Sequence, residues 1–219
     1  AQQRDFYSVD IEQKITDLIE SPGNAVLDKL RASDFNLSNE ERANLAVYIA
    51  TMVKRVPRIR DRGHELAPKS LAKVTAELNE QIREAERAGR ISSEWASQHL
   101  AETERISAKF SGKPPRDVVD QIESPWPSEQ MIQLIYEMHW RFVCTDGAHQ
   151  FVTSDNPVFF FECWGLNNDE SEITFPISSQ LAIFASWTPI RKASDRVVVS
   201  SRFVKEANSR LAVGASRFI

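Results

Sequence analysis

The 219-residue chain has only two cysteines and no long apolar run. Cys144 and Cys163 are too few for a disulfide framework and lack the spacing of a metal site, which predicts reduced core residues in a cytosolic protein. No apolar stretch approaches the roughly 20 residues that span a bilayer, and no signal peptide is recognisable. These absences predict a cytoplasmic protein that does not cross a membrane.

The common catalytic signatures are also missing. Because G-x-x-x-x-G-K-[ST], G-x-G-x-x-G, H-E-x-x-H and G-x-S-x-G do not occur, the usual nucleotide-binding, zinc-protease and esterase functions lack support. The histidines at 64, 99, 139 and 149 have no ligand spacing, which favours surface or core positions. Cys144 and His149 flank one predicted turn, but closeness in sequence alone does not indicate a nucleophile pair. The net charge of −4 gives no reason to expect a nucleic-acid coat over the whole surface, while a local basic patch stays open.

The composition, 42% hydrophobic and 26% charged, is sufficient for a sizeable core in a chain of this length. We predict a single domain, 1–219, of the α+β class. A mainly helical N-terminal part packs on a small, mostly antiparallel C-terminal sheet, with a projecting αα-hairpin. The predicted parts are core helices at 1–66, the αα-hairpin at 67–111, a connector at 112–127, and a central helix, sheet and C-terminal helix at 128–219.

Helical periodicity dominates the first 140 residues. Ser38 and Glu41 have capping-box spacing, and an apolar stripe follows from Leu45 to Ile59. Pro57, near the end of this stripe, is predicted to kink or end the helix. Upstream, the pattern predicts two short helices around a break at Ser21-Pro22-Gly23.

Two amphipathic helices, at 67–88 and from Ser93 onward, predict the αα-hairpin. The charge on its outer face is most simply solvated, and binding of a protein partner at 67–111 is the alternative. A short helix is predicted at Asp117–Ile122. The segment 128–140 is apolar nearly all round, which predicts a buried helix under the sheet.

The strongest β signal lies between Phe142 and Glu162. Asp146-Gly147 separates two β-rich runs, Arg141–Thr145 and Gln150–Thr153, and predicts a hairpin. Asp155-Asn156-Pro157 predicts a bend before Val158–Phe161, whose three phenylalanines predict a strand covered on both faces. Further strands are expected at 173–176, 181–187 and 197–199, followed by a helix at 205–216 and a possible return of 217–219 to the sheet.

Four short motifs occur in an order that resembles one family. They are Arg55-Val56-Pro57, the F-x-T-S-D-N-P-V pattern at 151–158, Phe175-Pro176-Ile177-Ser178, and the closing Asn208 with Ala215-Ser216-Arg217-Phe218. Over most of its length the chain resembles a widespread, mostly bacterial family, the domain of unknown function numbered 4238. Members typically begin with a segment containing H-Y-V-P. That segment is absent here and the chain starts at Ala1 without a methionine, so we expect that a front segment is missing. The family has no established activity, so the resemblance implies no role for these residues.

Asp155 is the leading candidate for chemistry. In a structural interpretation its carboxylate and the Asn156 amide cap the turn. In a functional interpretation the turn presents Asp155 to a pocket, with Ser154 and Asn156 as neighbouring donors. Together with Glu162, or with Asp146, its carboxylate would then hold Mg²⁺ or Mn²⁺ through oxygen ligands.

A row of arginines accompanies the apolar stripe. Arg55, Arg58 and Arg62 fall along one flank of the predicted helix, with Arg55 nearest the core. A partly buried guanidinium needs an acceptor, so Arg55 is predicted to have a partner. For Arg58 and Arg62, solvated charges that complement the helix dipole are an equally open interpretation. Arg55 and Arg58 would also be suited to grip a phosphate.

Three functions follow from these candidates. The first is a bacterial effector that binds a nucleic acid or other phosphate ligand and hydrolyses it with a divalent metal, with Asp155 as the catalytic residue and Arg55, Arg58, Ser154 and Asn156 binding the ligand. The second is a non-catalytic module that binds a ligand or a protein. The third is structural, with Arg55 and Asp155 as a buried ion pair. The first is the most concrete, and whether the protein is an enzyme stays open.

Overall fold

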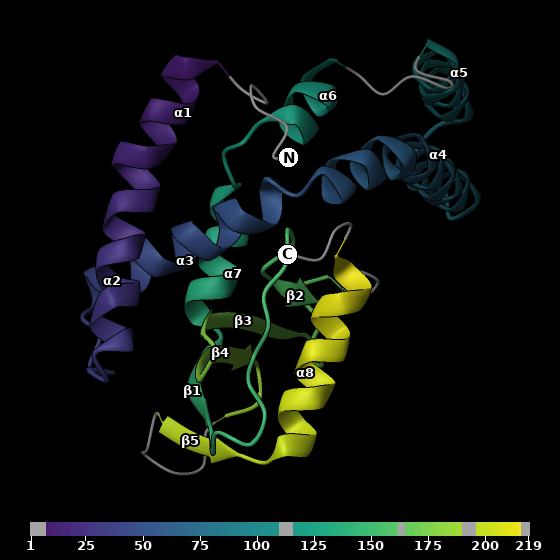
Figure 1. Ribbon diagram of the computed structural model, residues 1–219. Helices are drawn as coiled ribbons and strands as arrows, with labels where there is room; N and C mark the ends of the chain where they lie inside the picture. The colour runs from purple at the N-terminus through teal and green to yellow at the C-terminus, as the bar shows by residue number, and fades with distance from the viewer. Residues whose placement is uncertain (1–7, 110–115, 162–164, 190–195, 216–219) are drawn as a thin grey trace. The chain divides into compact units, whose positions relative to one another are not determined.

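The computed structural model describes residues 8–109, 116–161, 165–189 and 196–215, with the backbone alone at 57–59 and 109 (Figure 1). Its helices and its five-stranded, mixed but mostly antiparallel sheet confirm the predicted α+β class. The internal contacts divide the chain into two compact units. We call Ala1–Val56 with Pro125–Ile219 the sheet unit and Pro57–Ser124 the hairpin unit.

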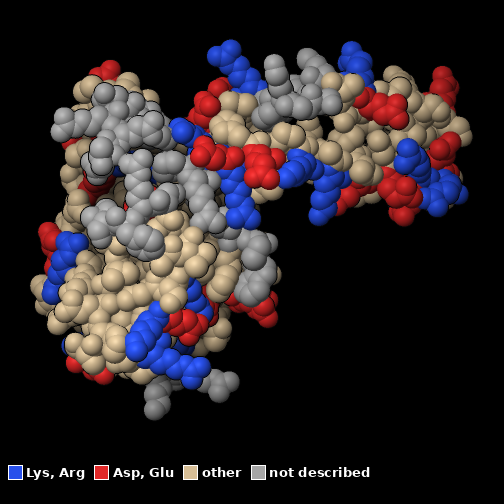
Figure 2. Space-filling model, turned by 45° about the vertical axis from the view of Figure 1, so that its right-hand side comes forward, with Lys and Arg blue, Asp and Glu red and all other residues tan. Residues whose placement is uncertain are grey.

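The hairpin unit consists of α4 (Pro57–Arg87), α5 (Ser93–Lys109) and α6 (Arg116–Glu123). A hydrogen bond of 2.5 Å from the Thr103 hydroxyl to the Asn79 side chain joins α4 to α5, far from their connection, so the two helices run antiparallel. Ile82 and Ala96 are buried along the same seam. Figure 2 shows basic and acidic side chains interleaved along these helices on the face in view. Helix α4 begins at Pro57, ten residues before the predicted start of the hairpin, because Pro is well suited to a first helical position.

The sheet unit begins with a continuous helical segment rather than two separate helices. Helix α1 (Val9–Ile15) continues through a π-helical turn, η1 (Thr16–Glu20), into α2 (Ser21–Arg31). The predicted break at Ser21-Pro22-Gly23 is therefore wrong. The Ser21 N–H donates to the Thr16 carbonyl in the wider π-helical spacing, and Pro22, which has no N–H to place, falls in the first turn of α2.

Close packing of α2 on α3 (Asn39–Lys54) depends on a glycine. Gly23 is buried against Tyr48, and a Cβ atom at this position would lie 2.8 Å from the Tyr48 Cβ. Helix α3 starts with the predicted capping box. The Ser38 hydroxyl accepts from the Glu41 N–H at 3.1 Å, and the Glu41 carboxylate accepts from the Ser38 N–H at 2.7 Å.

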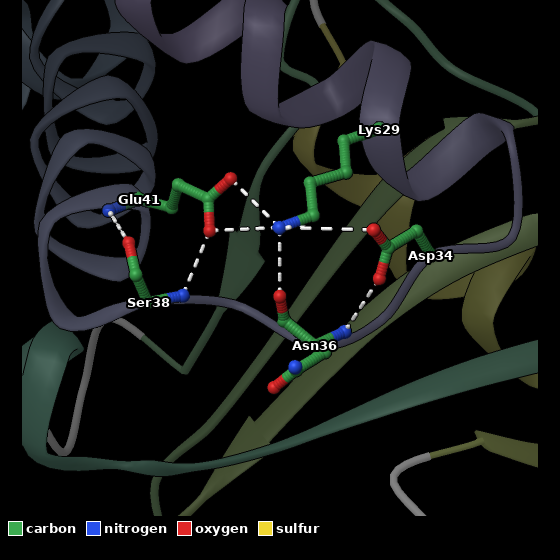
Figure 3. A network of polar contacts seen from close by, with 5 residues as sticks. All are labelled: Lys29, Asp34, Asn36, Ser38 and Glu41. Atoms are coloured by element: carbon green, nitrogen blue, oxygen red, sulfur yellow. Dashed lines mark hydrogen bonds and ion pairs between the residues drawn. The ribbon is translucent and has the colours of Figure 1, made fainter.

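The capping glutamate also holds the loop between α2 and α3 (Figure 3). The Lys29 ammonium donates to both Glu41 oxygens, at 2.8 and 2.9 Å, and to the Asn36 carbonyl at 2.7 Å. The Asp34 carboxylate lies 3.8 Å from the same ammonium. The hydrogen bond between the Lys29 ammonium and the Glu41 carboxylate lowers the pKa of Glu41 and raises the pKa of Lys29. One acidic side chain thus caps α3 and fixes the loop that precedes it.

The sheet contains β1 (His139–Thr145), β2 (Phe159–Phe160), β3 (Glu172–Ser178), β4 (Leu181–Ser186) and β5 (Arg196–Val199), in the order β2-β3-β4-β1-β5. Among the strand pairs of the described residues, only β1–β5 is parallel. Alternate β1 residues separate the two faces: Phe142 packs into the large core with α2, α3 and α7 (Glu129–Glu137), whereas Val143 packs with α8 (Ser201–Gly214). Helices therefore cover both faces of the sheet (Figure 1). The strands expected at 173–176, 181–187 and 197–199 are present.

The predicted hairpin after β1 is wrong. β1 already pairs with β4 on one side and β5 on the other, so β1 has no free edge that Gln150–Thr153 could join, and this segment is not a strand. The Asp146-Gly147 turn does form, with Gly147 at a φ of 93°. The three phenylalanines at 159–161 are half-buried rather than covered on both faces, because β2 is a two-residue strand at the edge of the sheet.

The helix predicted at 128–140 ends earlier, at Glu137. The Arg42 guanidinium donates to the Tyr136 carbonyl at 2.8 Å and to the Met138 carbonyl at 2.6 Å, and it lies 4.2 Å from the centre of the Trp140 ring. These bonds satisfy carbonyls that the end of a helix leaves without partners. The chain turns at this point into β1, which contains Trp140.

Substitution of Gly23 by Ala is expected to destabilise the sheet unit, because the added methyl group must displace Tyr48 or separate α2 from α3. We expect a loss of about 1–3 kcal/mol in the free energy of unfolding, measured by urea denaturation. The neighbouring Asn24 is exposed, so Asn24→Ala is the matched control and should change stability by less than about 0.5 kcal/mol. Equal stability of Gly23→Ala and wild type would contradict the close packing.

Candidate functional site

The Ser154-Asp155-Asn156-Pro157 motif forms the predicted bend, but the hydrogen bonds described within it are made by the Ser154 hydroxyl rather than by the Asn156 amide. The Ser154 hydroxyl accepts from the Asn156 N–H at 3.1 Å and donates to the Asn156 carbonyl at 2.9 Å. Both side chains are only 7% exposed. The Asn156 amide donates at 3.2 Å to the Gly214 carbonyl in the last turn of α8. Ser154 and Asn156 were predicted as ligand donors. In the structure they instead bond backbone groups of the turn and of the end of α8.

A second asparagine, Asn208 on α8, holds the segment that leads into this turn. Its side-chain oxygen accepts from the Val152 N–H at 3.0 Å, and its nitrogen donates to the Gln150 carbonyl at 2.8 Å. One side chain thus makes both bonds that a neighbouring strand would make. The Phe151 N–H donates to the Ser179 carbonyl at 2.8 Å and Phe151 itself is buried. We call residues 150–156 the clamped segment, because Asn208 and Asn156 attach it to α8.

The predicted metal site is only partly described. Asp155 is half-buried within the turn, whereas Glu162 and Cys163 lie outside the described residues. Asp146 is used locally, since its carboxylate accepts from the Ala148 N–H at 3.1 Å. Over the described part of the chain, no group of three or more His, Cys, Asp or Glu side chains is placed to hold a metal ion. The described contacts therefore add no further ligand to Asp155.

Arg55 has the acidic partners that its position predicts, although neither is Asp155. It is the C-cap residue of α3 and is 28% exposed. Its guanidinium forms ion pairs of 2.5 Å with Glu20 in η1 and 3.0 Å with Glu12 in α1. Two carboxylates already neutralise the group that was a candidate for phosphate binding. The ion pairs instead attach α1 and η1 to the end of α3.

The other arginines of the predicted row follow Pro57. Arg58 and Arg62 belong to the hairpin unit, and the side chain of Arg58 lies outside the described residues. Beside Arg55, burial lowers the pKa of Lys54, and burial together with the Glu20 carboxylate raises the pKa of Tyr48. The surroundings of Arg55 are therefore partly shielded from water.

Sequence reasoning missed Arg210, which fastens α8 to the sheet. Its guanidinium pairs with Glu172 of β3 at 2.9 Å and with Glu206 at 2.5 Å, and it lies 5.3 Å from the centre of the Phe161 ring. The four-residue spacing of Glu206 and Arg210 was a readable signal. The contact with Glu172 joins residues 38 positions apart, and no local sequence pattern indicated it.

Cys144 is a free, buried thiol, as predicted. Its sulfur accepts from the Arg196 side chain at 3.3 Å, a contact that joins β1 to β5. The carbonyl of His149 accepts from the Thr145 hydroxyl and closes the turn after β1. Cys144 and His149 thus take part in contacts that hold β1, β5 and the turn after β1 together.

The hairpin unit exposes several large apolar side chains. Four of them, which we call the hairpin face, retain the following fractions of their surface: Val74 59%, Leu78 43%, Trp95 43% and Ile106 42%. Trp95 stacks on His99 with ring centres 3.5 Å apart. Large side chains this exposed on both helices of one pair typically mark an interaction surface.

The geometry of the pair places these four side chains on the same side. Asn79 and Thr103 mark the seam, where they are hydrogen-bonded. Leu78 precedes Asn79 by one residue and Ile106 follows Thr103 by three, offsets that turn both side chains to one flank of an antiparallel pair. Val74 lies about one turn from Leu78, and Trp95 about three turns from Ile106, on the same two stripes. Val74, Leu78 and Ile106 therefore lie on one flank of the pair, and Trp95 lies about three turns farther along the same flank, with His99 and Glu102 between Trp95 and Ile106 on α5.

Comparison with family models assigns the chain to a family. The model described as "Protein of unknown function (DUF4238)" matches residues 1–219. The chain belongs to this family. Neither a curated protein nor a solved structure shows significant similarity to it. Among the described helices, none is both long enough and apolar enough to cross a membrane. Membership confirms the predicted family and assigns no activity, so function must be argued from the side chains.

A mutant cycle between Arg55 and its two acidic partners, Glu12 and Glu20, tests the structural role of the arginine. We expect Arg55→Ala to lower the free energy of unfolding by more than the roughly 1 kcal/mol of an exposed ion pair and less than the roughly 3–5 kcal/mol of a buried one. The loss should be much smaller in a Glu12→Ala, Glu20→Ala background, because the partners are then already absent.

Lys205→Ala is the control for this cycle, since Lys205 is an exposed cation on α8. Its removal should leave stability unchanged within about 0.5 kcal/mol. If Arg55→Ala is as harmless as Lys205→Ala, the ion pairs do not stabilise the fold.

Proposed function

We propose that the protein is a non-catalytic protein-binding module whose binding surface is the hairpin face. The observation that carries the proposal is the set of four large apolar side chains, contributed by both helices, that remain 42–59% exposed. Such a surface gains free energy when a partner removes it from water, at about 25 cal/mol per Å² of apolar area. The partner role at 67–111, which the sequence left as an alternative to simple solvation, thereby becomes the preferred one.

The construction of the helix pair supports this function. Its seam is narrow: Ile82 and Ala96 are buried, and the polar Asn79–Thr103 contact occupies its middle. Trp95, Val74, Leu78 and Ile106 lie outside the seam, whereas Ile82 lies within it. A pair that served only as a stable spacer would bury its largest side chains between its helices, because most helical stability comes from packing. The arrangement favours a surface kept for another protein.

The described contacts give less support to a hydrolase that acts on nucleic acid or another phosphate ligand. Arg55 is paired with Glu12 and Glu20, so a phosphate would have to displace two carboxylates. Ser154 and Asn156 are buried and bonded within the clamped segment. The alternative in which Arg55 is structural therefore agrees better with the geometry, although the acidic partners differ from the predicted Asp155.

In-cell crosslinking of the full chain, followed by mass spectrometry, tests the proposal. The variant Val74→Lys with Leu78→Lys places two charges on the hairpin face, where they oppose burial. The matched control, Ala72→Lys with Ala76→Lys, adds the same charges at exposed positions on the other flank of α4. We expect wild type and control to crosslink to the same protein partner, and the face variant to lose that partner by tenfold or more.

The proposal is overturned if every crosslinked partner is recovered equally with the face variant. Circular dichroism and a thermal unfolding curve for each variant ensure that a lost partner reflects the surface rather than unfolding.

A further inference from the structure

We propose that α1 is a strap that closes over the end of α3, and that the π-helical turn η1 sets the register in which it closes. One extra residue in the wider turn brings an acidic side chain of α1 and another of η1 onto the same flank, where both reach Arg55. Because an ion pair holds the strap, the strap opens and closes at η1 in response to charge and salt.

The wider turn contains one residue more than an α-helical turn. The Ser21 N–H donates to the carbonyl of Thr16, five residues earlier, whereas an α-helix joins residues four apart. Successive α-helical residues are rotated by about 100°, so two side chains eight positions apart are about 80° out of line. When the wider turn absorbs one residue, eight positions rotate the chain as about seven would, and the two side chains return to within about 20° of each other.

Pairs of residues eight positions apart do share a face across η1. Glu12 and Glu20 both contact the Arg55 guanidinium, at 3.0 and 2.5 Å. Ile15 and Gly23, which are also eight apart, are both buried. In a regular α-helix of the same sequence, Glu12 and Ile15 would point about 80° away from the face that α2 packs on α3. The extra residue of η1 therefore keeps α1 in line with α2.

The described contacts hold α1 less firmly than α2. Within α1, all of which is described, Ile15 is the one buried residue, whereas α2 buries four. Segments that bury few side chains open locally most easily, and π-helical turns are places where helices bend. Opening at η1 releases Ile15 and the Glu12 carboxylate while Glu20 stays on Arg55. The Glu12–Arg55 contact is therefore the one that closes the strap.

Amide hydrogen exchange on the purified full chain tests the strap. Glu12→Gln removes the charge that α1 brings to Arg55 and keeps the size of the side chain. We expect exchange across Val9–Ile15 to become about three- to tenfold faster, while exchange across α2 stays within about twofold of wild type. Raising the salt concentration should speed exchange across α1 more in wild type than in Glu12→Gln, because salt weakens the ion pair.

Asp17→Asn is the matched control for Glu12→Gln. Asp17 is exposed in η1, and the replacement removes one charge but keeps the oxygen that accepts from the Gln13 side chain at 2.9 Å. Exchange across α1 should stay within about twofold of wild type. The strap is overturned if Glu12→Gln leaves α1 as protected as this control does, or if it speeds exchange across α1 and α2 alike.

Two variants of different length test the register. Deletion of the exposed Asp17 removes the extra residue, so η1 becomes an α-helical turn and Glu12 stays in line with Glu20. Exchange across α1 should remain within about threefold of wild type, and Glu12→Gln should still speed it in this background. Insertion of one alanine after Asp17 instead rotates α1 by about another 100°. Exchange across α1 should then be fast, and Glu12→Gln should not speed it further.

The register is overturned if the deletion loosens α1 as much as Glu12→Gln does, or if the insertion leaves α1 protected. Exchange across α2 shows whether each length variant keeps the rest of the helix. Where the insertion also disturbs α2, the deletion variant decides.

Discussion

A segment with an extended backbone and no strand beside it must bond its N–H and C=O groups in another way, because leaving them unpaired costs free energy. Gln150 and Val152 meet this constraint along α8. The Asn208 side chain pairs with Gln150 and Val152 in place of a strand, and Asn156 bonds the carbonyl of Gly214. The clamp acts together with the packing of Val204 and Ala207 on Val143 and with the Arg210–Glu172 ion pair to hold α8 on the sheet.

The same constraint explains why the polar residues that suggested chemistry are placed as they are. The motif that contains Ser154 and Asn156 and the closing motif that begins at Asn208 are separated by about 50 residues, yet they meet on one helix. Arg55, the other candidate, joins the N-terminal helices to α3. With these groups used by the fold, the hairpin face is a surface that the described contacts leave exposed.

Local signals predicted local structure well. The capping box of Ser38 and Glu41 and the strands β3 and β4 needed only neighbouring residues to form, so sequence spacing was sufficient. The partners of Arg55 and the course of Gln150–Thr153 depended on distant residues. The β-rich composition of that segment predicted a strand, which the structure does not form there. It could not reveal that β5 had already taken the free edge of β1, or that an asparagine of α8 would replace the missing strand.

Amide hydrogen exchange in wild type and Asn208→Ala tests the clamp most directly. In wild type the Val152 N–H is bonded to Asn208, and the adjacent Phe151 N–H is bonded to Ser179 on the opposite side. The account predicts that Asn208→Ala speeds exchange at Val152 by about tenfold or more, which corresponds to about 1.4 kcal/mol of lost protection, while Phe151 keeps most of its protection. Equal exchange at Val152 in the two proteins would contradict it.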